Sequence, residues 1–325
     1  MGGGVGGGVV NKRKGDRRRT TPGSSGRSAS KGRQRAPRRA GDPAGGRPGR
    51  ASSGGGRREG LGGDQVEGRN AVLELLRGDR RVREVYVVED RDSPVLAEIA
   101  DLAAQRRVTV HQVSSRRLEG LARSEVPQGV VAIASPLEPV ELEDLARRPA
   151  PAGGAALVAV LDGITDPGNL GAILRSVEVL GFSGAVLPRH RAVRVTPAAA
   201  KAAAGAIEHL PLAVVGGVPA AISRLRELGV WVVGLDSSAD QPVSDIGVAD
   251  EPLALVLGSE GAGLSRLARE RCDRLVAIPQ PGLTDSLNVA AAAAVAAHEI
   301  VRQRRELRRR NAGGSGQHGG ADTPE

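Results

Sequence analysis

Asn169 and Arg175 are side chains that could orient a ligand, and both lie in the segment LDGITDPGNLGAILRSVEVLG, residues 161–181. In this segment an apolar run ends in a turn of Gly, Asp and Pro, and a helical pattern follows from about Asn169. Arg175 comes six residues later, less than two helical turns away, so both side chains can face one crevice. An amide and a guanidinium hold oxygen atoms of a ligand by hydrogen bonds. A helix-capping Asn and a solvated Arg would give the same spacing.

A second candidate segment is LALVLGSEGAGLSRLARERC, residues 253–272, in which an apolar run ends in a glycine-rich turn. Glycines such as Gly258 and Gly263 let backbone N–H groups approach a ligand closely. The turn is not a phosphate-binding loop, because no Gly-Lys-Ser or Gly-Lys-Thr closes it and Glu260 would repel a diphosphate. A dinucleotide fingerprint is disfavoured as well, since that turn follows the first strand of its sheet and this one comes late in the chain.

The third candidate segment, LTDSLNVAAAAAVAAHEIVRQRR at 283–305, places four polar side chains directly before five alanines. Thr284, Asp285, Ser286 and Asn288 can all accept hydrogen bonds, and such residues cap helices whose interior is rich in alanine. Capping accounts for one or two of the four. The remaining polar residues, and a helix with such small side chains, therefore call for a further explanation.

These segments need a scaffold, and the sequence predicts a mostly parallel α/β sheet. Short continuous apolar runs alternate with helical stretches, which is the pattern of strands buried on both faces. The runs lie at 156–162, 184–188, 230–236, 253–258 and 274–279. Ligands of such sheets bind at the carboxyl ends of the strands. All three polar segments follow a predicted strand, so we expect them to contribute to one site.

A smaller α/β unit precedes this sheet. Its helices are predicted at 66–78, 93–107 and 114–123, and its strands at 83–90, 108–113 and 128–136. A Pro- and Gly-rich joint follows it. The expected organisation is a disordered basic tail over 1–64, the small α/β unit over 65–137, a linker over 138–154, the main α/β domain over 155–305 and a flexible tail over 306–325.

Positive charge is concentrated at the ends of the chain. The net charge is +9 over 325 residues, yet the first 64 residues hold sixteen Lys and Arg against four Asp and Glu. Residues 65–300 are net acidic, with a charge of −6. A flexible Arg-rich arm suits polyanion binding, because neutralised phosphates release counterions. A solubilising extension or an organelle transit peptide would have a similar composition.

Composition excludes several classes of protein. The single cysteine, Cys272, excludes an intramolecular disulfide and a cysteine-cluster metal site, and the five histidines include no metal-spaced pair. Tyr86, Phe182 and Trp231 are the only aromatic residues, too few for a module that stacks bases on aromatic platforms. No segment is apolar enough for a secretory signal or a membrane span, so we expect a cytoplasmic, metal-free protein.

Together the three segments resemble the motifs of the SpoU (TrmH-like) family of RNA ribose 2′-O-methyltransferases, in the same order and spacing. The first, second and third motifs are matched by DPGNLGAILRS, LVLGSEGAGLS and IPQPGLTDSLNVAAAAAVAAHE. The resemblance covers residues 66–303, and it is strongest to the branch that methylates a guanosine in the peptidyl-transferase region of 23S ribosomal RNA. Gly168 and the PQG at 127–129 depart from the family pattern, on the expected RNA side.

The resemblance implies a fold and a cofactor. The fold class would be α/β, with a SPOUT-type parallel-sheet domain that contains a deep trefoil knot, preceded by a small α/β RNA-binding domain. The cofactor would be S-adenosyl-L-methionine. The residues implied to hold it are Gly258, Ile278, Leu287, Leu235 and Gly263, with Asp236 as a further candidate.

The resemblance also implies a reaction and partners. A ribose 2′-hydroxyl would attack the methyl group of the cofactor in line, so the enzyme must align atoms and assist removal of one proton. The implied catalytic residues are Arg175, Asn169, Glu260, Ser286 and Asn288. Large-subunit ribosomal RNA and a second copy of the chain would be the partners, with no metal and no membrane.

Three alternatives stay open. Transfer RNA is the other substrate within the family. A non-catalytic RNA-binding or ribosome-assembly protein could keep the fold alone, although the candidate catalytic residues argue for catalysis. A nucleotide-dependent enzyme of the doubly wound type is disfavoured by the late glycine turn. Binding of S-adenosylmethionine, NAD or ATP would separate these classes.

Overall fold

The computed structural model describes residues 61–89, 93–190, 194–283 and 286–314. Most of the predicted basic tail therefore lies outside the described residues, as do Thr284, Asp285 and residues 315–325. The described part contains two sheets with their helices, and the smaller sheet comes first in the chain.

The small unit is built on a mixed four-stranded sheet in the order β1-β4-β2-β3. Its strands are β1 (Gln65–Glu67), β2 (Val82–Val88), β3 (Thr109–Val113) and β4 (Val130–Ala134), and its helices are α1 (Arg69–Arg77), α2 (Pro94–Gln105) and α3 (Ser115–Leu121). Helices α1 and α2 share one hydrophobic core with the sheet, and α3 covers a smaller cluster around Leu118. The helix predicted from residue 66 begins later, because β1 pairs with β4 and Gly68, at φ 96°, turns the chain.

The second sheet has six strands, all parallel, in the order β10-β8-β9-β5-β6-β7. Its strands are β5 (Leu157–Asp162), β6 (Gly184–Pro188), β7 (Leu212–Val215), β8 (Trp231–Leu235), β9 (Leu253–Gly258) and β10 (Arg274–Val276). The predicted α/β class, the parallel sheet and its five predicted strands are confirmed. The prediction misses β7, whose four residues form a short apolar run at the edge of the sheet.

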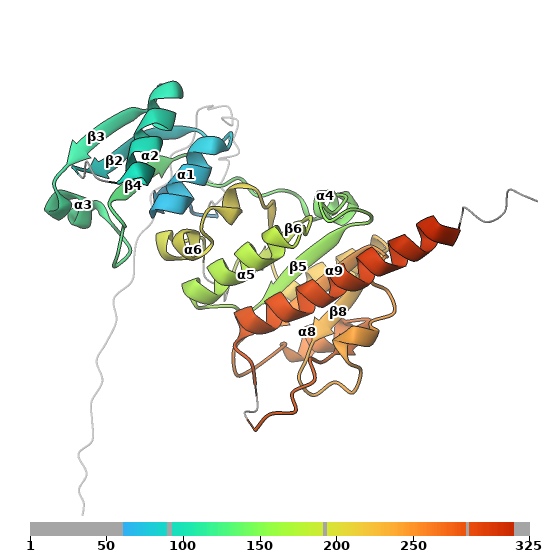
Figure 1. Cartoon of the computed structure of the whole chain (residues 1–325). Helices are drawn as coiled ribbons and strands as arrows, with labels where there is room; N and C mark the ends of the chain where they lie inside the picture. Colours follow the sequence, from blue (N-terminus) through green and yellow to red (C-terminus); the bar gives the residue numbers. More distant parts are fainter. Residues whose placement is uncertain (1–60, 90–92, 191–193, 284–285, 315–325) are drawn as a thin grey trace, which may run out of the picture. The chain divides into compact units, whose positions relative to one another are not determined.

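Helices cover both faces of the six-stranded sheet (Figure 1). One face carries α5 (Pro167–Val179), α6 (Pro197–Ala202), the short helix η1 (Ala206–Glu208) and α9 (Val289–Gly314), and the other carries α4 (Leu142–Arg147), α7 (Val218–Glu227) and α8 (Arg266–Arg271). Each face has its own cluster of buried aliphatic side chains. The sheet therefore lies between two hydrophobic layers, which hold its strand ends in place.

The alanines of α9 allow this helix to pack closely against α5, beside which it lies in Figure 1. Ala293, Ala296 and Ala297 are completely buried on α9. Alanine adds little beyond the backbone, so two helices that meet at alanines can approach closely. Gly171 gives α5 a similar fit to α6, since a Cβ there would lie 2.4 Å from the carbonyl oxygen of Ala199.

The register of the sheet brings the ends of its central strands together. Asp162 at the end of β5 pairs with Gly258 at the end of β9, and β8 ends one position earlier, at Leu235. The segment after β10 joins this edge, because the N–H of Ala277 donates to the carbonyl of Gln241 at 2.8 Å, in the loop after β8. The three polar segments therefore follow strands that end at one edge, as predicted. A trefoil knot requires such contact between the segment after β10 and the loop after β8.

A buried arginine, Arg304, fixes the C-terminal helix. The residue is 1% exposed, and its guanidinium donates to four carbonyl oxygens at 2.6 to 3.3 Å. These carbonyls belong to Ala249, Ala155, Ala156 and Glu251. Burial, together with the nearby charge of Arg308, lowers the pKa of Arg304 to about 10, so it stays charged at neutral pH. The helix continues beyond it to Gly314, past the boundary expected at residue 305.

Replacing Arg304 by alanine should destabilise the fold by roughly 3 kcal/mol, because four carbonyl oxygens lose their donor and a cavity remains. Arg305→Ala is the matched control, since it removes an exposed arginine from the next position of the same helix. Urea denaturation measures the free energy of unfolding of each variant. Equal values for the two variants would show that the buried guanidinium does not hold α9.

Candidate functional site

Three side chains, one from each polar segment, form a hydrogen-bonded cluster. The amide of Asn169 donates from Nδ2 to Glu260 Oε2 at 3.0 Å. The amide of Asn288 donates from Nδ2 to Asn169 Oδ1 at 3.0 Å and to Glu260 Oε1 at 3.5 Å. We call these three residues the amide–carboxylate cluster.

Asn288 caps α9 and belongs to the cluster at the same time. Its Oδ1 accepts from the backbone N–H groups of Ala290 at 2.9 Å and Ala291 at 3.4 Å. Its Nδ2 makes the bonds to Asn169 and Glu260. The two ends of one amide therefore have different tasks, and capping alone does not account for this residue.

The other two cluster members are fixed by the turns that carry them. Asp166 Oδ1 accepts from the backbone N–H of Asn169 at 2.7 Å and caps α5. The loop that carries Glu260 is closed by a pair of backbone hydrogen bonds between Ser259 and Gly263, at 3.0 and 2.9 Å. Both side chains therefore start from backbone that is already held in one conformation.

A cavity of about 370 Å³ opens at the ends of β8, β9 and β10. All five residues expected to hold the cofactor line it, namely Leu235, Gly258, Gly263, Ile278 and Leu287. Glu260 and Ser286 line it as well, and so connect it to the catalytic candidates. Two further polar residues, Ser237 and Gln280, also line it. Gln280 lies within the third motif segment, whereas Ser237 lies in none of the three. We call this space the cofactor cavity.

Gly258, at the end of β9, leaves no room for a side chain. An added Cβ would lie 2.1 Å from the carbonyl carbon of Gly263 and 2.3 Å from the backbone nitrogen of Leu264. The loop therefore folds back onto the end of its own strand, which only glycine permits at this position.

Arg175 lies apart from the cluster. Its side chain is exposed on α5 and lines a second cavity, of about 640 Å³, which contains no residue of the cofactor cavity. Among the described residues, no hydrogen bond joins Arg175 to the amide–carboxylate cluster. Asn169 lines neither cavity, so the expectation that Asn169 and Arg175 face one crevice stays a prediction.

Asp236, the further cofactor candidate, is engaged in its own loop. Its Oδ1 accepts from the backbone N–H and the hydroxyl of Ser238, at 2.9 and 2.7 Å, and its Oδ2 lies 3.2 Å from Arg269. Burial opposes ionisation, but the Ser238 hydrogen bonds and the Arg269 charge hold the pKa of Asp236 below its usual value. The carboxylate therefore stabilises the loop after β8.

Other kinds of chemistry find little support in the described part of the chain. No three His, Cys, Asp or Glu side chains there form a group that could bind a metal ion. None of the described helices has both the length and the apolar character needed to cross a membrane. Burial, with the charges of neighbouring carboxylates, raises the pKa of the Cys272 thiol to about 12, so it is not a nucleophile at neutral pH.

Comparison with known proteins identifies the family to which this parallel sheet, its cavity and the preceding small α/β unit belong. Residues 156–298 match the SpoU rRNA Methylase family, and residues 65–140 match the RNA 2′-O ribose methyltransferase substrate-binding family. The structure is similar to the crystal structure of the SpoU methyltransferase AviRb from Streptomyces viridochromogenes in complex with the cofactor AdoMet. The TM-score is 0.62 and the identity 28%, over 74% of this chain and 90% of that one.

Two relatives match over nearly their whole length. The chain is 37% identical over 241 residues to YacO of Bacillus subtilis, which is assigned to the TrmH family of tRNA/rRNA methyltransferases, over 74% of this chain and 96% of YacO. It is also 37% identical over 249 residues to the 23S rRNA (guanosine-2′-O-)-methyltransferase RlmB of Pseudomonas putida, over 75% of this chain and 98% of RlmB. The chain therefore belongs to the SpoU family of S-adenosylmethionine-dependent RNA ribose 2′-O-methyltransferases.

The cofactor cavity fits S-adenosylmethionine. Its volume of about 370 Å³ is in the range of small-molecule sites. Leu235, Ile278 and Leu287 offer apolar contacts for an adenine ring, and the glycine turn lets backbone groups approach a ligand. The carboxylate of Glu260 favours a positively charged ligand over a phosphate.

Asn288→Ala and Asn288→Ser should separate the two roles of Asn288. A serine hydroxyl still caps α9 and an alanine does not, so the free energy of unfolding should be about 1 kcal/mol lower for Asn288→Ala. Both variants lose the donor to Asn169 and Glu260, so both should bind S-adenosylmethionine about 10-fold more weakly. Urea denaturation and titration calorimetry measure the two effects. Unchanged cofactor affinity in Asn288→Ser would make Asn288 a helix cap alone.

Gly258→Ala should weaken S-adenosylmethionine binding by about 10-fold or more, because the added methyl group forces the loop at 259–264 away from the strand end. Gly216→Ala is the control, since a Cβ at Gly216 meets no atom within 4 Å. Titration calorimetry on both variants gives the comparison. Equal affinities would remove the loop after β9 from the cofactor site.

Proposed function

We propose that the substrate is a guanosine of 23S ribosomal RNA and that its ribose 2′-hydroxyl receives the methyl group. The observation that carries the proposal is that the amide–carboxylate cluster and the cofactor cavity share Glu260, so that all three polar segments contribute to one site. The likeness to RlmB of Pseudomonas putida, over 98% of that protein, supports the choice of the nucleotide.

In this proposal the cluster provides alignment. S-adenosylmethionine, when bound, supplies a methyl group on a positively charged sulfur that is ready for transfer. Leu235, Ile278 and Leu287 would hold the adenosyl group, and Ser286 would border the reacting end of the cavity. Because Asn169 and Asn288 hold the Glu260 carboxylate, it needs no rearrangement to face the cofactor.

Arg175 would act on the RNA. Its guanidinium lines the second cavity, apart from the residues that would hold the cofactor. A guanidinium remains protonated at neutral pH, so it orients the ribose or its phosphate by donating hydrogen bonds and does not accept the proton. The proton of the 2′-hydroxyl would then leave through a neighbouring phosphate oxygen of the RNA or through water.

Transfer RNA is the second candidate substrate, because YacO of Bacillus subtilis is assigned to a family of tRNA/rRNA methyltransferases. A non-catalytic RNA-binding role is disfavoured. An RNA-binding scaffold would need neither a cavity with these lining residues nor a carboxylate held by two amides beside it.

We also propose that two copies of the chain act together in the cytoplasm on large-subunit ribosomal RNA. Val179 of α5 and Val295 of α9 are 72% and 46% exposed, on two helices that pack against each other. Burial of exposed apolar area against a partner surface is favourable. A second copy of the chain would supply that surface.

Methyl transfer to purified RNA tests the function. The protein is incubated with S-adenosylmethionine and either 23S ribosomal RNA lacking the modification or unmodified transfer RNA, and ribose methylation is mapped by nucleotide. We expect one methylated guanosine in 23S ribosomal RNA. Methylation of transfer RNA alone would favour the second candidate, and no transfer to either RNA would overturn the proposal.

Arg175→Ala should lower kcat roughly 100-fold, because the reacting ribose loses its orienting donor. The Kd for S-adenosylmethionine should stay within about 2-fold of the wild-type value, since Arg175 does not line the cofactor cavity. Arg175→Lys keeps the charge without the planar fork and should recover part of the rate. Single-turnover transfer and calorimetry measure both quantities. Near-normal turnover of Arg175→Ala would end this assignment.

A further inference from the structure

The second cavity lies between the methyltransferase domain and the small unit. Arg175 lines it from α5, and Lys201 lines it from α6. On the other side it is lined by the start of α1 and by residues 123–128, which lie in the loop between α3 and β4. Its volume of about 640 Å³ exceeds that of the cofactor cavity. We call it the domain cavity and residues 123–128 the cavity loop.

The lining of the domain cavity suits a nucleotide of RNA. Its lining includes three cations (Arg123, Arg175 and Lys201), one carboxylate (Glu125) and three neutral hydrogen-bonding side chains (Asn70, Ser124 and Gln128). Cations bind phosphate, and amides and hydroxyls recognise base edges. Val126, which is 58% exposed, offers an apolar surface for a base. No aromatic side chain lines the cavity, in keeping with their scarcity in the sequence.

A buried carboxylate holds one end of the cavity loop. Glu67 of β1 is 0% exposed, and it accepts from the backbone N–H of Arg123 at 2.6 Å and of Ser124 at 3.1 Å. The hydroxyl of Ser124 and the amide of Gln65 also donate to it, at 2.5 and 2.7 Å. A buried carboxylate is costly unless it is fully hydrogen-bonded, so these bonds fix the loop where Arg123 begins it.

The other end of the cavity loop is held from two helices. Arg69 of α1 donates to Gln128 twice, from its backbone N–H to Oε1 at 3.2 Å and from Nε to the carbonyl oxygen at 3.0 Å. Lys201 of α6 donates from Nζ to the carbonyl oxygen of Val126 at 2.5 Å. The loop therefore joins the small unit to the methyltransferase domain.

Backbone strain also gathers at this cavity. Only three described residues other than glycine have a left-handed backbone, and two of them, Gln128 at φ 57° and Ala204 at φ 50°, line the domain cavity. Such a conformation costs a side-chain-bearing residue roughly 1 kcal/mol, and proteins keep it mainly where function requires it.

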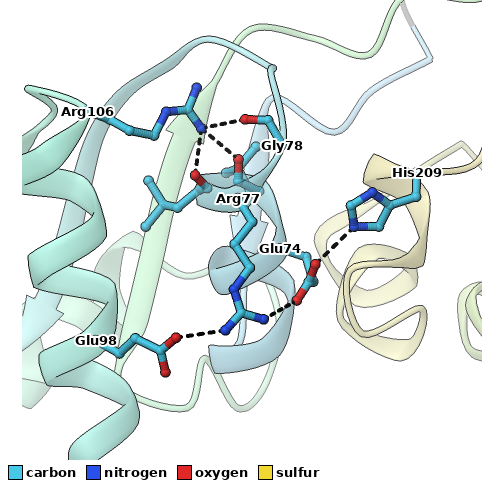
Figure 2. Close-up of polar contacts among 8 residues, drawn as sticks. Glu74, Arg77, Gly78, Glu98, Arg106 and His209 are labelled. Atoms are coloured by element: carbon cyan, nitrogen blue, oxygen red, sulfur yellow. Dashed lines mark hydrogen bonds and ion pairs between the residues drawn. The ribbon is translucent and has the colours of Figure 1, made fainter.

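Polar contacts also join α1 of the small unit to the η1 segment of the methyltransferase domain, and Figure 2 shows the one between Glu74 and His209. Glu74 of α1 contacts His209, which follows η1, at 2.9 Å. Arg80 contacts Glu208 of η1 at 2.7 Å, with side chains only 12% and 6% exposed. These contacts hold the small unit against the methyltransferase domain, and so they help to fix the shape of the domain cavity.

We propose that the domain cavity binds the RNA nucleotide that adjoins the methylated ribose, with Arg123 and Lys201 at its phosphate and the cavity loop at its base. The proposal rests on the proposed function. Arg123 also lies 3.7 Å from Asp64, but both side chains are more than half exposed, so a phosphate can replace this pair. Glu67 is a positioning residue, since it acts only through the loop that it holds.

Arg123→Ala tests the subsite. It should raise the KM for RNA about 10-fold, because one charge-assisted contact to phosphate is lost, while kcat at saturating RNA and the Kd for S-adenosylmethionine stay unchanged. The salt dependence of RNA affinity should become less steep by about one unit of slope. Arg116→Ala is the matched control. It removes the same charge from an exposed position of α3 that does not line the cavity, and it should change KM by less than about 2-fold.

Glu67→Gln tests the positioning role. The amide cannot accept from both backbone N–H groups and the Ser124 hydroxyl, so Arg123 should shift and KM for RNA should rise as in Arg123→Ala. Combining the two substitutions should add little, because both act on one contact. Effects that multiply in the double variant would show that Glu67 does not act through Arg123.

The outcomes separate this proposal from the proposed function. Equal KM values for Arg123→Ala and Arg116→Ala, with an active wild-type enzyme, would overturn the subsite and leave the function in place. A wild-type protein that methylates no RNA would overturn the function itself.

Discussion

The hydrogen bonds among Asn169, Glu260 and Asn288 are the interaction on which the site depends. Each residue belongs to a different loop, and the loops follow different strands of the parallel sheet. Asn288 also caps α9, so the start of the C-terminal helix and the position of the cluster are set together. The buried alanines of α9 also help to position the cluster. They let this helix pack closely against α5, whose first turn carries Asn169.

Helix α5 connects the two halves of the proposed reaction. Asn169 in its first turn belongs to the cluster beside the cofactor cavity, and Arg175 faces the domain cavity. A methyl transfer must align two ligands of different chemistry. The cofactor has an apolar adenosyl group and a positively charged sulfur, and the RNA is a polyanion. Glu260 lines the cofactor cavity, whereas in the domain cavity three cations outnumber the one carboxylate, Glu125, so each cavity has the charge that suits its ligand.

The sequence predicted those features that depend on residues close together in the chain. Apolar runs identified the long strands, and the polar loops that follow them pointed to Asn169, Glu260 and Asn288. The cofactor residues Leu235, Ile278 and Leu287 came from the resemblance to the SpoU motifs. Glu67 could not be found in this way, since its partners Arg123 and Ser124 lie more than fifty residues away and its own segment lies at the start of a helical pattern. Arg304 lies in a basic run that is typical of solvated surface, yet it is among the largest fully buried side chains of the described chain. Its four carbonyl partners come from tertiary structure alone.

The central claim is that Glu260, held by two amides, makes the three loops into one cofactor site. Calorimetric titration of Glu260→Ala with S-adenosylmethionine tests it most directly, because Glu260 is exposed and its loss should not unfold the chain. The account predicts a Kd at least about 10-fold higher than that of the wild type, with an unchanged melting temperature. An unchanged Kd would contradict it.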